Sequence, residues 1–157
     1  MPTFWTIQHV DHWKAFEQTG VLQASDAHVD PDFQFAYGWM RKQMQQYIPC
    51  PMPPLYPLWA WYKYDTHRYR PDLRRAAHLP SGTPGVLITF EADFSQVLLT
   101  DFVSWHMVLN SQKELKCFSQ IIIEPTQKRR LRTAIIQATL WRVTMEQVKQ
   151  VTYFKAR

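Results

Sequence analysis

The sequence predicts a single mixed α+β domain over residues 1–157, on the basis of its length, its motifs and the order of its elements. The 157 residues are 46% hydrophobic, enough for one domain with a real core. The order is a strand, two helices, three strands, a helix and a closing strand–turn–strand unit, without regular βαβ alternation. The sequence lacks GxGxxG, GxxxxGK[ST], GxSxG and HExxH, and this argues against a doubly wound nucleotide-binding fold.

The first element is a predicted strand over residues 3–8 (TFWTIQ), which is rich in β-branched and aromatic residues. Residues 11–20 (DHWKAFEQTG) predict a short helix that packs back on this strand. Asp11 is its expected N-cap, and Gly20 stands where a helix would stop.

A second helix is predicted over residues 30–48, with Asp30 as N-cap and Pro31 at the first helical position. Its apolar side chains recur every three or four residues and are expected in the core: Phe33, Tyr37, Met40, Met44 and Tyr47. Residues 49–57 (PCPMPPLYP) contain five prolines in nine residues, which predicts a rigid extended crossover.

The middle of the chain predicts three strands and a helix. Residues 58–64 place Trp59 and Trp61 on one strand face. Strands are expected over residues 86–92 and 96–102, joined by residues 93–95 as a hairpin or tight corner, and then a short helix over residues 104–110, capped by Ser104.

The closing unit combines a strand (135–143), a capped turn (144–148) and a last strand (151–154). Thr144 and Gln147 have capping-box spacing. In the first strand Ile136, Ala138 and Leu140 are expected to face the core, and an amide, a hydroxyl and an indole share the other face: Gln137, Thr139 and Trp141. That second face is either solvated or part of a cleft.

Composition leaves the partner open. The net charge is +5 and the pI is near 9.3, with basic residues concentrated at 67–75 (HRYRPDLRR) and 128–132 (KRRLR). Such clusters form either a solvated rim or a phosphate-binding surface. No segment approaches the roughly 20 apolar residues of a membrane helix and no secretory leader is apparent, so we expect a cytoplasmic protein with no membrane partner. Neither the cysteines nor His9 and His12 have metal-site spacing, so no metal is expected.

Several motifs resemble an uncharacterised bacterial family of unknown function: TIQ, FAYGWM, YPLWAWY, RPDLR, LLTDFVSWHMVLN and IQATLW. The two ends of the chain also resemble small ADP-ribosyltransferases, including toxins that modify DNA. The opening TIQ…HW…TGVL and the closing polar strand, capped turn and strand carry this second resemblance.

The second resemblance implies a split mixed or antiparallel sheet with flanking helices, whose cleft holds NAD as a substrate. Residue by residue, Gln8 falls at the strand-one position, where the family usually has Arg or His. Gln137 falls at the late-strand position, where Glu is commoner. A neutral amide can orient ribose hydroxyls, but it cannot supply charge or take a proton.

Further residues are expected at the same site. Asp101 and His106 could meet as an acid–imidazole pair, and they join Gln137 as catalytic candidates. Asp101 could instead fix local backbone. The expected cofactor-binding residues are Gln8, Trp61 as a stacking ring, Arg70 on the pyrophosphate, and Thr139 beside Gln137.

The function expected from this resemblance is ADP-ribose transfer to a macromolecule, with nucleic acid slightly favoured over protein as the acceptor. A toxin or phage-defence role with an antitoxin-like partner is implied by analogy. The alternative is a non-catalytic module in which Trp59, Trp61 and the arginine-rich loops bind single-stranded nucleic acid.

Overall fold

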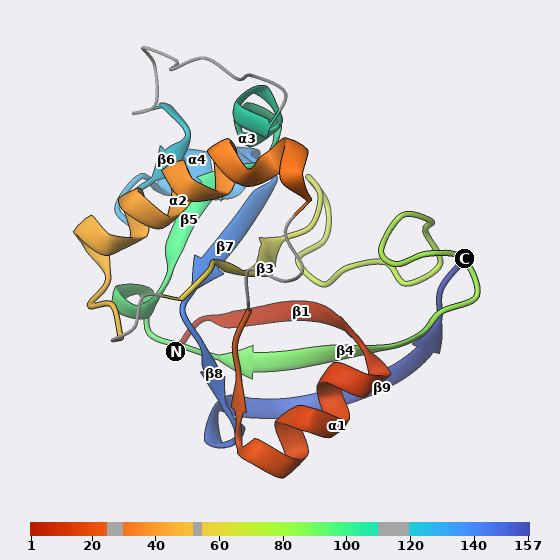
Figure 1. Ribbon diagram of the computed structural model, residues 1–157. Coiled ribbons are helices and arrows are strands. Elements are labelled where there is room, and N and C mark those ends of the chain that lie inside the picture. The colour runs from red at the N-terminus through yellow and green to blue at the C-terminus, as the bar shows by residue number, and fades with distance from the viewer. Residues whose placement is uncertain (25–29, 52–54, 110–119) are drawn as a thin grey trace.

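The computed structural model describes residues 1–24, 30–51, 55–109 and 120–157. Its centre is a seven-stranded antiparallel sheet with the order β6-β5-β7-β3-β1-β4-β9 (Figure 1). The strands are β1 Thr3–His9, β3 Leu58–Lys63, β4 Pro84–Glu91, β5 Leu98–Asp101, β6 Ile122–Ile123, β7 Ile136–Leu140 and β9 Val148–Lys155. A separate pair joins β2 Val21–Leu22 to β8 Val143–Thr144. The α+β prediction is confirmed.

Helices cover both faces of this sheet (Figure 1). They are α1 Val10–Thr19, α2 Gln34–Tyr47, α3 Phe102–Leu109 and α4 Lys128–Thr133. On the α1 face, Trp13 and Phe16 of the helix pack with strand residues such as Phe4. On the opposite α2/α3 face, Met40 and Trp105 pack in a second cluster that includes Trp141. No helix in the described ranges is long and apolar enough to cross a membrane.

The ends of α1 partly confirm the prediction. Gly20 adopts a left-handed φ of 76° and its N–H donates to Phe16 O at 2.7 Å, which ends the helix as expected. The predicted N-cap was wrong, because β1 runs directly into the helix. His9 is the cap, and its Nδ1 accepts from the Asp11 N–H at 3.0 Å.

The second helix begins as predicted. Asp30 caps a 3-10 turn, Pro31–Phe33, which leads into α2. Met40 and Met44 are fully buried, which confirms the core prediction for them. Tyr47, at the end of the helix, is 50% exposed, so its place in the predicted core was wrong.

The predicted hairpin between residues 86–92 and 96–102 was wrong, whereas the tight corner is present. β4 pairs with β1 and β9, while β5 pairs with β7 and β6 on the other side of the sheet. Asp93 and Gln96 form a capping box around the short 3-10 turn Phe94–Gln96. This turn carries the chain from one part of the sheet to the other.

The capped turn and last strand of the closing unit are confirmed, whereas the predicted strand 135–143 is divided into β7, which ends at Leu140, and β8, which pairs with β2. The Thr144 N–H donates to Gln147 Oε1 at 2.8 Å in the capped turn between β8 and β9. Ile136 and Ala138 of β7 are fully buried on the α1 face. The other face of β7 is not solvated, since Thr139 is 0% and Trp141 only 3% exposed beneath the α2/α3 cluster.

The sheet divides between β1 and β3. Their register contains the single pair Trp5↔Trp61, whereas β1 pairs with β4 along its whole length. Just beyond the pair, the Thr6 hydroxyl donates to Trp59 O at 2.8 Å. The two halves, β6-β5-β7-β3 and β1-β4-β9, are therefore joined over a short contact and diverge on either side of it.

Candidate functional site

A row of four side chains crosses the sheet at this junction. Trp5 of β1 is opposite Trp61 of β3, Trp61 is opposite Gln137 of β7, and Gln137 is opposite Thr100 of β5. Residues directly opposite in antiparallel strands point to the same side. Two predicted site residues, Trp61 and Gln137, are therefore neighbours on the α2/α3 face.

Aromatic rings enclose this row. The Trp61 ring centroid lies 5.1 Å from that of Phe102 and 5.0 Å from that of Tyr64. Phe102 in turn contacts the His106 ring at 4.3 Å, so α3 connects His106 to the row through one intervening ring. Burial raises the pKa of Tyr64, which stays neutral at physiological pH.

Three buried polar atoms on this face have no hydrogen-bond partner among the described residues. They are Gln137 Oε1, Thr100 Oγ1 and Trp59 Nε1. An unsatisfied buried polar group costs about 1–3 kcal/mol, and such groups are rare in native proteins. Two can accept and one can only donate, so a polar ligand group that reached them would find complementary partners.

Thr139 and Asp101 have structural partners. The Thr139 hydroxyl points to Met40 Sδ at 3.7 Å and Leu98 O at 3.5 Å, beneath α2. Asp101 Oδ1 accepts from the Ser104 N–H at 3.1 Å and so caps the start of α3. Ser104 was therefore wrong as the cap, and the structure supports the expectation that Asp101 fixes local backbone. His106 Nδ1 lies 2.9 Å from Phe102 O.

Gln8 lies on the other side of the sheet. Its Nε2 donates to Thr6 Oγ1 at 2.8 Å, and its Oε1 lies 3.4 Å from His12 Nδ1 on α1. Its ladder partner Val86 belongs to the α1-face cluster. The structure therefore does not bring Gln8 and Gln137 together.

Sequence reasoning missed His9, the last residue of β1, which falls on the Gln137 face by alternation. Its side chain is 36% exposed and lies 3.5 Å from the Asp11 carboxylate. The available signal was the two-residue period of β1 combined with the Trp5↔Trp61 register. The period can be read from the sequence, whereas the register is known only from the structure.

Arg70 lies over the far half of the sheet, in the loop of residues 64–83. Its Nη2 is 3.4 Å from Thr152 Oγ1 on β9. Thr152 of β9 is opposite Leu87 of β4, and Leu87 is opposite Ile7 of β1. Ile7 points to the same side as Trp5 of the row, so Arg70 and Gln137 lie on the same face of the sheet, on opposite sides of the division.

Asp72 organises this loop. Its carboxylate accepts from the Arg74 guanidinium at 2.9 and 3.0 Å and from the Arg74 N–H at 3.1 Å. The side-chain hydrogen bond from Arg74, followed by the backbone one, holds the pKa of Asp72 far below its usual range. Arg68 lies 3.5 Å from the same carboxylate. The charges of Arg68 and Arg74 are therefore partly neutralised.

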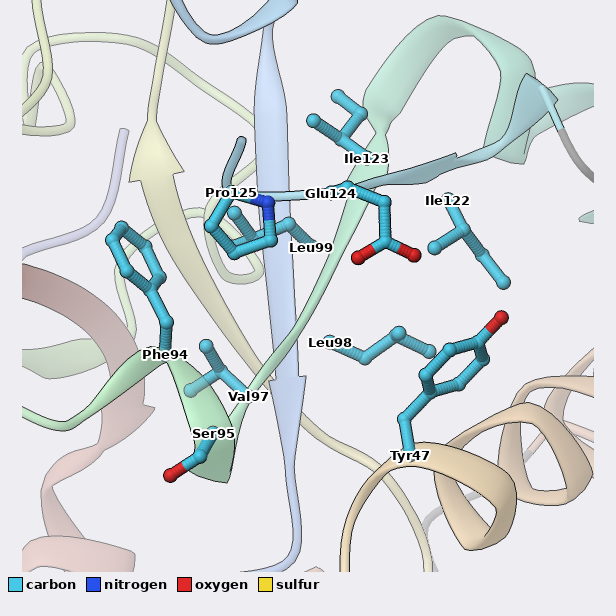
Figure 2. Close-up of a pocket in the computed structure, with 10 residues that line it drawn as sticks. All are labelled: Tyr47, Phe94, Ser95, Val97, Leu98, Leu99, Ile122, Ile123, Glu124 and Pro125. Atoms are coloured by element: carbon cyan, nitrogen blue, oxygen red, sulfur yellow. The ribbon is translucent and has the colours of Figure 1, made fainter. Parts of the chain in front are cut away.

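Two cavities lie at the other end of β7. Figure 2 shows one of about 110 Å³, where the Glu124 carboxylate and the Tyr47 ring lie among apolar walls and the Ser95 hydroxyl points away. A second, of about 430 Å³, is lined by residues that include Trp141 and Arg142. Neither is lined by Gln137 or Trp61. No three His, Cys, Asp or Glu side chains cluster as a metal site in the described part of the chain.

The fold and the row define an α+β protein with a divided antiparallel sheet and a polar and aromatic face at the division. Residues 3–114 match the family described as Domain of unknown function (DUF3841), and the chain belongs to this family. The predicted membership of an uncharacterised family is confirmed. Comparisons with curated proteins and with solved structures each gave no match.

Proposed function

We propose that this chain is an ADP-ribosyltransferase-like protein that binds NAD where the sheet divides. One observation carries the proposal: Gln137 lies directly opposite Trp61 beside the split, with its Oε1 buried and unpaired. A divided sheet, a stacking ring and a late-strand amide on one face are the features that the resemblance implied together.

The side chains of the row suit recognition better than acid–base chemistry. Gln137 Oε1 can accept a hydrogen bond from a ribose hydroxyl, and the Trp61 ring offers a π face to the nicotinamide. Transfer replaces the nicotinamide–ribose C–N bond by a bond to the acceptor nucleophile, whose proton must leave. Gln137 cannot take that proton, whereas the imidazole of His106 can. Because the neutral amide of Gln137 also supplies no charge to stabilise the oxocarbenium ion, we expect slow turnover.

The test uses labelled NAD with the purified protein. Calorimetric titration at millimolar NAD measures binding, and release of nicotinamide in the presence of RNA, DNA or lysate measures transfer. Gln137→Ala should weaken binding, while Gln150→Ala, at an exposed glutamine of β9, serves as the matched control. Absence of both binding and label transfer would overturn the proposal.

A toxin or phage-defence role and an antitoxin-like partner belong to the same proposal, by analogy with the resembled toxins. Regulated expression in a bacterial host tests this role. Growth arrest that Gln137→Ala relieves would support it, and unimpaired growth at equal protein levels would count against it.

The alternative function, a non-catalytic nucleic-acid module, was expected to use both strand tryptophans. Trp59 lies 5.0 Å from Trp105 and 5.8 Å from Tyr37, and Trp61 contacts Phe102 and Tyr64, so both rings have protein neighbours. The alternative is less favoured because it needs two stacking rings, and Trp59 packs against the α2/α3 cluster. Salt-sensitive, NAD-independent binding that Trp61→Ala abolishes would favour the alternative.

A further inference from the structure

We infer that a basic surface formed by α4 and the loop after β3 binds single-stranded nucleic acid. The name basic surface refers here to Lys128, Arg129 and Arg132 of α4 together with Arg68 and Tyr69 of the loop. These are parts of the two basic segments, 128–132 and 67–75, which are separate in the sequence.

Lys63 joins the two segments. This residue is the last of β3 and is only 4% exposed. Its ammonium group donates to Arg132 O at the end of α4, and it also lies 5.5 Å from the centroid of the Tyr69 ring. One buried cation therefore links the end of α4 to the loop.

The cations of α4 divide into one structural and three exposed residues. Arg130 is turned inward, where its guanidinium donates to Ile122 O at 3.0 Å and also to Gln120 O. Lys128, Arg129 and Arg132 are exposed and form no ion pair with any described residue. Like charges three and four residues apart repel on a helix, so an anionic partner would relieve this repulsion.

Tyr69 supplies an aromatic ring beside these cations. It is 47% exposed, and Tyr62 beneath it holds the ring edge-on at a centroid distance of 5.8 Å and an angle of 87°. An exposed ring held by its neighbours, on a surface that also carries exposed cations, is the arrangement that binds a base and its neighbouring phosphates. A duplex keeps its bases stacked on each other, so the ring favours a single strand.

The basic surface and the candidate NAD site lie on opposite faces of the sheet, because Lys63 is opposite Ile136, which is buried on the α1 face, whereas Gln137 lies on the α2/α3 face. Tyr62 and Lys63 follow Trp61 directly in β3, and α4 leads into β7, where Gln137 is the second residue. A bound strand would therefore lie across the sheet from the row of the site. Its role as the acceptor of ADP-ribose rests on the proposed function, whereas the binding itself does not.

The test is an anisotropy titration of a labelled single-stranded oligonucleotide of about 20 nucleotides, repeated over a range of salt concentrations. We expect R129Q/R132Q to lower the affinity at least about tenfold and to reduce the slope of log K against log salt by about 1.4, since each phosphate contact adds about 0.7 for single strands. Y69L should lower the affinity with an unchanged slope.

The control is K14Q/K155Q, which removes two exposed lysines from α1 and β9. Equal binding by R129Q/R132Q and this control would overturn the inference, as would tighter binding to anionic phosphatidylserine vesicles with no effect of Y69L. NAD binding should be the same in all these variants. If the protein does not bind NAD, the oligonucleotide titration still tests whether the basic surface binds single-stranded nucleic acid.

Discussion

Gln137 is the residue on which the proposed function depends most. Its neighbours are fixed by two ladder registers, to Trp61 and to Thr100, and its Oε1 has no protein partner. The sequence located Gln137 and Thr139 on one face of β7, with Trp141 just after the strand, because strand alternation is a local property. The sequence could not show that Gln8 lies on the opposite face from Gln137. That depends on the register of β1 against β3, set by the pair Trp5↔Trp61, whose members are 56 positions apart in the chain.

At position 137 a carboxylate should increase turnover. Gln137→Glu adds a negative charge that can stabilise a developing oxocarbenium ion, so we expect nicotinamide release to rise at least about tenfold. Gln137→Ala should show no such gain. A Gln137→Glu variant that folds, binds NAD and releases nicotinamide no faster than the native protein would contradict this assignment.

Asp72 should make stability depend on pH. Its pKa is lowered in the folded protein by Arg74, so its stabilising effect is present above the unfolded pKa of about 4 and is lost as pH falls through the lower folded value. Thermal unfolding from pH 7 to pH 2 should show Asp72→Asn less stable than the native protein at neutral pH. The two curves should converge in acid, and a constant difference would contradict the role of the carboxylate.

At the scale of elements, local signals were predictable and pairing partners were not. Gly20, Asp30 with Pro31, and the Thr144–Gln147 box act within a few residues, and each was identified in the sequence. For the connection between β4 and β5 the sequence left two alternatives open, a hairpin and a tight corner, because a short connection is compatible with both. Here the capped turn after Asp93 instead moves the chain across the sheet.

Asp101 should act as a helix cap more than as a catalytic acid. Asp101→Ala removes the acceptor for the Ser104 N–H and should cost about 1 kcal/mol in denaturant unfolding, whereas Asp101→Asn keeps an acceptor and should cost much less. Nicotinamide release should follow the same order. Equal loss of activity in both variants, with the stability of Asp101→Asn unchanged, would restore Asp101 to catalysis.

Gly20→Ala tests the other helix end. A Cβ at Gly20 meets no atom within 4 Å, so the expected cost of about 1 kcal/mol arises from the left-handed φ of 76° alone. Chemical denaturation measures it. NAD binding should be unchanged, because Gly20 lies at the end of α1, away from the row.

At the scale of the whole molecule, the division of the sheet connects the parts of the account. The two halves share the core cluster of the α1 face and meet through one strand pair, and the polar row crosses that contact. Composition and periodicity predicted the α+β class, and only the resemblance predicted a split. The two basic segments were apparent in the sequence, but their association could not be predicted, because Lys63, Tyr69 and Arg132 are brought together by tertiary packing.

The most direct measurement is an NMR titration of the isotope-labelled protein with NAD, in which the seven tryptophan indole signals and the glutamine side-chain amides are assigned. We expect the largest shifts at the Trp61 indole and the Gln137 amide, with Gln150 and Trp13 little changed. Shifts confined to other residues, or none at millimolar NAD, would contradict the central claim that the divided sheet binds NAD beside Gln137.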